Sequence, residues 1–282
     1  MYKIGLSTTG ERLCEETIKE YAKSGIEFIE ISAGKREIDA INYDDLKMWT
    51  DTYGVKIWSF HLPFYPFDEL DISNDRLADY TVKYLTDIIK KACKIGVDKF
   101  IIHASGEPIE ESDRQSRMEC AKNSLFKLCE VAKEYGAVIC VEDLPRSCLG
   151  RNSSDISELL SSHKDLRACF DTNHLLGESN IDFIKKIGNK IVTMHVSDYD
   201  FINERHWLPG EGKNDWQGIL EALKEIDYQG IWLYEIDRKS PKTIIRQRDL
   251  EFSDFIRNAN EVFENKEITI FSTPKPNLGF WD

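Results

Sequence analysis

Polar side chains able to bind a metal or move protons stand at the ends of short apolar runs in this sequence. The run-ending residues are His61, His103, Glu142, Asp171, His195 and Glu235. His174 and His206 follow shortly after the sixth and seventh of eight such runs. Carboxylates and imidazoles together form a ligand set suited to Mn²⁺, Mg²⁺, Co²⁺ or Zn²⁺. A carboxylate held beside a substrate carbon can also remove a proton and return it.

The runs that carry these residues have the length and the Val, Ile and Phe content of buried strands. They cover residues 3–7, 28–32, 55–61, 99–103, 138–142, 167–171, 191–195 and 231–235. Amphipathic segments with a helical period alternate with them, at residues 11–24, 42–53, 76–94, 117–135, 154–162, 182–186, 216–226 and 250–263. Glycines such as Gly25, Gly54 and Gly96 follow several of these segments, which is typical of helix C-termini.

Strand and helix alternating in this way predict an α/β fold with a parallel sheet and helical crossovers. Eight units favour a closed (β/α)8 TIM barrel over an open doubly wound sheet, and no strand is followed by a nucleotide-binding glycine motif. We expect a single barrel domain over residues 1–263 and a short C-terminal tail, 264–282, packed on the barrel or on a partner. A barrel brings the carboxyl ends of its strands to one mouth, so the run-ending residues should converge there.

The charge balance of the 282 residues excludes several classes of partner. The net charge is −13, which argues against binding to a nucleic-acid backbone or to an anionic membrane surface. There is no apolar run of ~18 residues, and the N-terminus leads into a strand without a secretion signal. The seven cysteines include no CxxC pair, so we expect reduced thiols and a cytoplasmic protein. The sequence leaves a homo-oligomer open.

Three carboxylates converging at the predicted mouth would repel one another unless something neutralised them. A divalent cation would do so, and Glu142, Asp171, His195 and Glu235 offer it oxygen and nitrogen ligands. The alternative is a network of salt bridges with arginines near the strand ends, namely Arg146, Arg205 and Arg238.

Five motifs along the predicted barrel resemble the xylose-isomerase-like TIM barrels. They are VEDLPR at 141–146, CFDTNH at 169–174, MHVSD at 194–198, LPGEG at 208–212 followed by Trp216, and YEI at 234–236. This superfamily includes sugar phosphate isomerases and epimerases, ketose 3-epimerases, inosose dehydratases and apurinic-site endonucleases. Five motifs in the right order on the predicted strands point to the superfamily rather than to one reaction.

The resemblance implies that Glu142, Asp171, His195 and Glu235 bind one divalent metal ion. It also implies that Glu142 and Glu235 are catalytic and lie on opposite faces of the substrate. A metal at a substrate carbonyl would stabilise an enediolate while carboxylates move the proton. We therefore expect a metal-dependent isomerase or epimerase acting on a small sugar or sugar derivative.

Further residues are expected to contact this small carbohydrate substrate. The candidates are His61, His103, His174, His206 and Arg205. Trp58, Phe60, Phe64 and Trp207 could supply an apolar wall, although an ordinary place in the core is the favoured alternative for Trp58 and Phe60.

Two departures from the resemblance leave alternatives open. Ketose 3-epimerases have a second glutamate where this chain has Cys148. The four histidines His61, His103, His174 and His206 resemble ligands of the three-zinc endonucleases, with Glu204 in place of an Asp, and could hold additional metal. The alternatives are a keto-sugar lyase or dehydratase on the same site, a zinc phosphodiesterase of the endonuclease kind, and a barrel that only binds a ligand. The negative charge argues against the phosphodiesterase.

Overall fold

Eight parallel strands form a nearly closed barrel in the computed structural model, which describes residues 1–281. The strands are β1 (Ile4–Ser7), β2 (Phe28–Ile31), β3 (Lys56–His61), β4 (Lys99–Ile102), β5 (Val138–Glu142), β6 (Arg167–Asp171), β7 (Ile191–His195) and β8 (Trp232–Tyr234). Sequential neighbours pair from β1 to β7, and β8 pairs with β1. The main-chain N–H of Val196 donates to Leu233 at 2.8 Å and joins β7 to β8.

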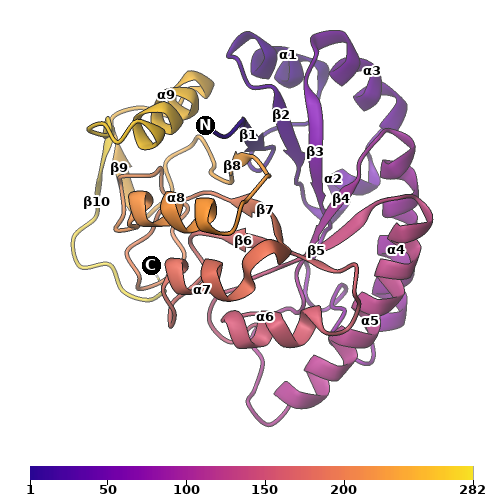
Figure 1. Cartoon of the computed structure of the whole chain (residues 1–282). Helices are drawn as coiled ribbons and strands as arrows, with labels where there is room; N and C mark the ends of the chain where they lie inside the picture. The colour runs from indigo at the N-terminus through magenta and orange to yellow at the C-terminus, as the bar shows by residue number, and fades with distance from the viewer. Residues whose placement is uncertain (282) are drawn as a thin grey trace.

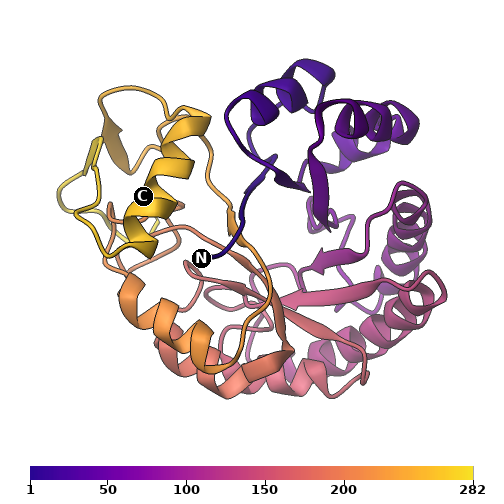
Figure 2. The ribbon, with the colours of Figure 1, turned by 45° about the horizontal axis from the view of Figure 1, so that its top comes forward.

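Helices surround this barrel as an outer layer (Figures 1 and 2). They are α1 (Glu15–Lys23), α2 (Lys35–Asp39), α3 (Tyr43–Tyr53), α4 (Ala78–Lys94), α5 (Arg114–Glu134), α6 (Ser153–Leu160), α7 (Asn180–Ile187), α8 (Trp216–Glu225) and α9 (Phe252–Phe263), with a short 3₁₀ turn at Gly188–Lys190. Each longer helix buries one face against the strands, as α4 does with Leu85, Ile88 and Ile89. Gly54 ends α3 in the left-handed conformation at φ 71°, which turns the chain into β3.

The predicted TIM barrel is confirmed, and three of its strands begin and end at the predicted residues. Residues 8–14 form a loop, so α1 begins later than predicted. The sequence pattern did not indicate α2, a five-residue helix that follows β2. In the described residues, no helix is long and apolar enough to cross a membrane.

The C-terminal segment contacts the barrel through a small second sheet and through side-chain hydrogen bonds. β10 (Ser272–Pro274) pairs antiparallel with β9 (Ile244–Arg246). Asn203 donates to the carbonyl of Phe280 at 2.5 Å, and Arg205 donates to that of Gly279 at 2.7 Å. These bonds place the tail beside the loop between β7 and α8. The domain boundary at residue 263 stays a prediction.

The loop between β7 and α8 is organised around the buried carboxylate of Asp198. One oxygen accepts the N–H groups of Tyr199 and Asn214 at 2.9 and 3.0 Å. The other accepts the N–H of Gly210 at 2.8 Å and the indole N–H of Trp216 at 3.1 Å. This single side chain therefore ties together both ends of the loop that carries Glu204 and His206.

Replacing Asp198 with Ala should destabilise the protein by about 3 kcal/mol or more, because several buried donors lose their acceptor. Asp198→Asn keeps one acceptor oxygen and should cost less. Urea unfolding followed by circular dichroism measures both variants. A loss below about 0.5 kcal/mol for the Ala variant, within the range of ordinary surface substitutions, would show that the loop does not depend on this carboxylate.

Candidate functional site

Four predicted ligands meet at the carboxyl ends of the strands. Glu142, Asp171 and His195 are the last residues of β5, β6 and β7, and Glu235 follows β8 directly. One ligand atom from each lies within 4.8 Å of the others, and we call this group the four-ligand cluster. The side chain of Glu235 is 13 % exposed, whereas the other three are almost completely buried. The cluster therefore opens to the mouth on the Glu235 side.

Glu142 lies at the centre of the site, and its two oxygens face different histidines. Oε1 is 2.9 Å from Nδ1 of His195, while Oε2 is 3.1 Å from Nε2 of His61 and 3.2 Å from Nε2 of His103. Burial opposes the ionisation of Glu142, but these histidines outweigh it and hold its pKa well below the usual range. Glu142 is therefore a carboxylate, shared between two groups of nitrogen ligands.

One carboxylate oxygen of Asp171 indicates whether a cation fits among these residues. Its Oδ1 accepts the N–H of Asn173 at 2.7 Å. Its Oδ2 is buried and has no hydrogen-bond partner among the described residues, although it points into the four-ligand cluster. Burial raises the pKa of Asp171 to about 6. A buried carboxylate oxygen without a donor is costly, and a divalent cation would satisfy it. The residues present fit such an ion.

Three histidines around the cluster are oriented by main-chain carbonyls. Nδ1 of His61 donates to Leu62 at 3.1 Å, that of His174 to Asp143 at 2.8 Å, and that of His206 to Glu235 at 3.2 Å. A carbonyl only accepts, so Nδ1 carries a hydrogen in each ring, and a ring that gives up its other proton has its lone pair on Nε2. Each ring therefore presents the nitrogen that a metal would bind.

These histidines belong to three further groups with ligand-like spacing. The groups are His61, His103 and Glu142; His61, His195 and Glu235; and His174, Glu204 and His206. The first two share residues with the four-ligand cluster. The third adjoins it, because Nε2 of His174 lies 3.7 Å from Asp171 and 3.5 Å from Glu204. All of these groups therefore form one continuous set.

Glu30, which the sequence pattern did not single out, contacts Nε2 of His195 and so orients its ring. It is fully buried in β2, accepts from Ser59 at 2.7 Å, and lies 3.1 Å from Nε2 of His195. A carboxylate behind a ligand histidine fixes its tautomer and raises its basicity. Nδ1 of His195 is thereby left to face Glu142 and, at 3.3 Å, Glu235. The sequence feature that could have pointed to Glu30 is its charge within the apolar run FIEI.

A polar cavity of about 440 Å³ lies over the four-ligand cluster. Its walls include the expected substrate-contacting residues His61, His103, His174, His206 and Arg205, together with Phe64, Cys148, Glu142 and Glu235. Phe64 stacks on His103 with ring centroids 3.7 Å apart. Burial raises the pKa of the Cys148 thiol to about 12, so a neutral thiol stands where ketose 3-epimerases have a glutamate.

Of the four aromatic candidates for an apolar wall, only Phe64 lines this cavity, so the wall was wrong for Trp207, whereas a place in the core was the favoured prediction for Trp58 and Phe60. Phe60 and Trp207 are almost fully buried in the protein interior, and Trp58 packs inside the barrel with Phe28, Ile231 and Leu233. Trp58 also donates to Thr193, on the opposite strand, at 3.0 Å. Alternation along a strand cannot distinguish the mouth of a barrel from its filled interior.

The arginines near the strand ends bind carboxylates outside the four-ligand cluster. Arg146 pairs with Glu107 and Glu204, and Arg238 pairs with Glu11. Arg205 donates to Asp200 at 2.9 Å, besides its bond to the tail, and its predicted contact with substrate stays a prediction. Arg146 and Arg238 therefore do not provide the salt-bridge network that would have replaced a cation.

Replacing Glu30 with Gln should lower metal affinity about 10-fold to 100-fold, because His195 loses the charged partner that orients it and raises its basicity. Competition with a fluorescent chelator measures the affinity. Glu27→Gln, an exposed change just before the same strand, is the matched control. Equal affinities for the two variants would show that Glu30 does not act through His195.

Comparison with known proteins agrees with the barrel fold. The family model for the xylose isomerase-like TIM barrel matches residues 18–255. The uncharacterized protein MJ1311 of Methanocaldococcus jannaschii is 26% identical over 246 residues, covering 84% of this chain and 82% of that protein. Fructoselysine 3-epimerase of Shigella flexneri is 22% identical over 253 residues, with coverages of 83% and 90%.

A solved structure of a D-tagatose 3-epimerase-like protein superimposes with a TM-score of 0.79 at 24% identity, covering 93% of this chain and 97% of that one. The structural similarity shows that the two proteins share a fold, and the family model covers most of the barrel. This chain belongs to the xylose isomerase-like TIM barrel family.

Proposed function

We propose that this protein is a divalent-metal-dependent isomerase or epimerase of a small sugar or sugar derivative. The observation that carries the proposal is the convergence of Glu142, Asp171, His195 and Glu235 within 4.8 Å, beside a cavity that Glu142 and Glu235 line. A divalent ion bound there would supply positive charge to stabilise negative charge on substrate oxygens. The relative named as fructoselysine 3-epimerase supports a keto-sugar as the substrate.

The two glutamates of the cluster are suited to different parts of the proton transfer. Glu235 is the more exposed, so it can reach a carbon-bound hydrogen beside the carbonyl and remove it as a proton. Glu142 has His195 on one oxygen and His61 and His103 on the other, so protons can pass between it and these rings. Return of the proton to the same carbon from the other face gives epimerisation, and its return to the neighbouring carbon gives isomerisation.

Cys148 bears on the choice between reactions. A protonated thiol at this position of the cavity does not replace a second glutamate as a base at neutral pH. We therefore keep isomerisation, epimerisation at another carbon, and elimination from a keto-sugar as variants of one proton-removal step.

The metal-loaded protein should exchange carbon-bound hydrogen of keto-sugars with deuterium from D2O. Glu235→Gln should lower the exchange rate by about 100-fold or more, because it removes the base and retains an oxygen ligand. Mass spectrometry of the recovered sugar measures the exchange, and Glu221→Gln on the exposed face of α8 is the matched control. The absence of exchange across a broad sugar panel, with metal bound, would contradict the proposed function.

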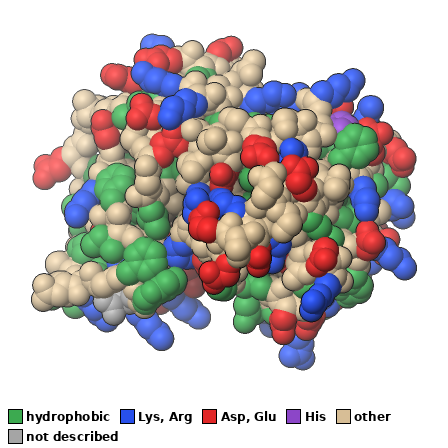
Figure 3. Space-filling model, turned by 90° about the horizontal axis from the view of Figure 1, so that it is seen from below, with side chains coloured by type: hydrophobic (Ala, Val, Ile, Leu, Met, Phe, Trp, Pro, Cys, Tyr) green, Lys and Arg blue, Asp and Glu red, His purple; other side chains and the backbone are tan. Residues whose placement is uncertain are grey.

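A second candidate, a phosphodiester-cleaving enzyme with several zinc ions, is favoured by one specific observation. Nε2 of His61 and of His174 face carboxylates, and His206 lies in one ligand-like group with His174 and Glu204, so this part of the chain can hold more than one ion. The net charge of −13 opposes it, and the face in Figure 3 mixes acidic and basic side chains without a continuous basic stripe.

Zinc loading should exceed one ion per chain, and His206→Ala should lower the stoichiometry by about one while leaving the first site filled. Burial opposes the charged form of His174, but Asp171, Glu142 and Glu204 outweigh it and raise its pKa to about 10. Below that pH the metal-free ring holds a proton that ligation must displace, so the additional site should bind more weakly at pH 6 than at pH 8.

Elemental analysis after dialysis at the two pH values measures this loading. One ion per chain at both values, in the wild type and in His206→Ala, would rule out the additional site. Cleavage of abasic-site duplex DNA by the zinc-loaded protein would favour the phosphodiesterase, and intact DNA would dismiss it.

A further inference from the structure

A second and larger cavity adjoins the one over the four-ligand cluster. It has a volume of about 870 Å³, compared with about 440 Å³ for the cavity over the cluster. The two share four lining residues, Thr9, Ser32, His61 and Phe64. These residues lie at or just beyond the ends of β1, β2 and β3, and we call the larger space the side cavity. A ligand seated on the cluster can therefore extend past His61 into the side cavity.

The walls of the side cavity combine apolar surface with polar groups. Leu13, Ile41, Leu46 and Trp49 provide the apolar part. Polar and charged side chains from the loop after β1 and from α2 and α3 provide the rest, including Arg12, Glu37, Asn42 and Asp45. Among the described residues, the guanidinium of Arg12 and the carboxylate of Asp45 have no hydrogen bond or ion pair. A ring or alkyl stem bearing polar groups suits such walls.

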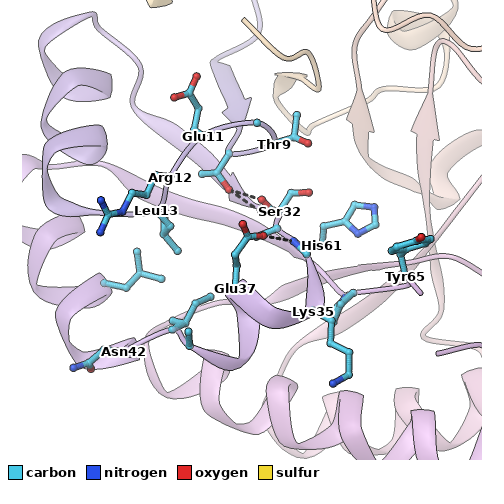
Figure 4. A pocket seen from close by; sticks show the side chains of 18 of the residues that line it. Thr9, Glu11, Arg12, Leu13, Ser32, Lys35, Glu37, Asn42, His61 and Tyr65 are labelled. Carbon is cyan, nitrogen blue, oxygen red and sulfur yellow. Dashed lines mark hydrogen bonds between the residues drawn. The ribbon is translucent and has the colours of Figure 1, made fainter. Parts of the chain in front are cut away.

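Local hydrogen bonds hold the walls in place without a ligand (Figure 4). Thr8 Oγ1 donates to the carbonyl of Ser32 and accepts its N–H, both at 2.9 Å, which joins the loops after β1 and β2. Glu37 accepts the N–H of Gly34 at 2.9 Å and fixes the start of α2. In Figure 4 the Lys35 side chain points away from Leu13 and Glu37, and it pairs with Asp39 at 3.3 Å. The cavity is preformed, which lowers the entropic cost of binding.

We propose that the substrate is a keto-sugar extended by a second polar group, with its reacting carbons over the four-ligand cluster and the appended group in the side cavity. This rests on the proposed function and narrows its substrate class. The appended group combines polar atoms with a carbon skeleton that can contact the apolar wall. An N-linked amino acid and a second sugar ring both have this chemistry. A free hexose would leave the larger of the two cavities to water.

The test compares three probes on the metal-loaded protein: a free ketose, an N-linked ketosyl amino acid and a keto-disaccharide. Deuterium exchange in D2O gives kcat and KM for each, and calorimetry gives binding without turnover. Ala40→Trp places a large side chain at an exposed position on the wall of the side cavity. Met48→Trp, on the exposed face of α3 outside that wall, is the matched control.

At least one extended probe should have a kcat/KM about tenfold or more above that of the free ketose. Ala40→Trp should remove this advantage through KM and leave exchange of the free ketose within about twofold. The extended probe that keeps the advantage in Met48→Trp identifies the appended group. Equal kcat/KM for all three probes, or an equal loss for free and extended probes in Ala40→Trp, would overturn the inference and leave the proposed function standing. No exchange with any probe would overturn both, even if calorimetry detected binding.

Discussion

The carboxylate of Glu142 is ionised although it is fully buried, and it has to be neutralised from two sides. His195 faces one oxygen, and His61 and His103 face the other. Asp171 and Glu235 add further negative charge within the same small volume, and one oxygen of Asp171 has no hydrogen-bond donor among residues 1–281. A buried group of this kind is stable only with positive charge among its members, supplied by protonated imidazoles or by a divalent cation.

Residues behind the ligands determine which of their atoms face this charge. Glu30 holds Nε2 of His195 and leaves Nδ1 to the cluster, whereas main-chain carbonyls hold Nδ1 of His61, His174 and His206. Asp198 fixes the loop that carries His206 by accepting four donors. The strands set the positions of the ligands, and these outer contacts set their tautomers and orientation.

Most of the strands and the convergence of their end residues could be predicted from sequence, because apolar runs in a parallel barrel end at one mouth. Glu30 could not be recognised, since a charge in the middle of a strand shows its purpose only when His195 is seen on the opposite side of the barrel. The place of Trp58 was left open between the mouth and the core for a related reason, because its alternation on β3 does not give its depth in the barrel. The contacts that orient β9, β10 and α2 involve residues far apart in the chain. The cytoplasmic location and the oligomeric state stay predictions.

The central claim is that Glu142, Asp171, His195 and Glu235 hold a divalent cation. Anomalous diffraction from crystals grown with Mn²⁺ or Zn²⁺ tests it most directly, because it locates the ion without reference to activity. The account predicts an anomalous peak within bonding distance of all four side chains. A metal-loaded crystal with no peak at this position, or with peaks only at surface carboxylates, would contradict it.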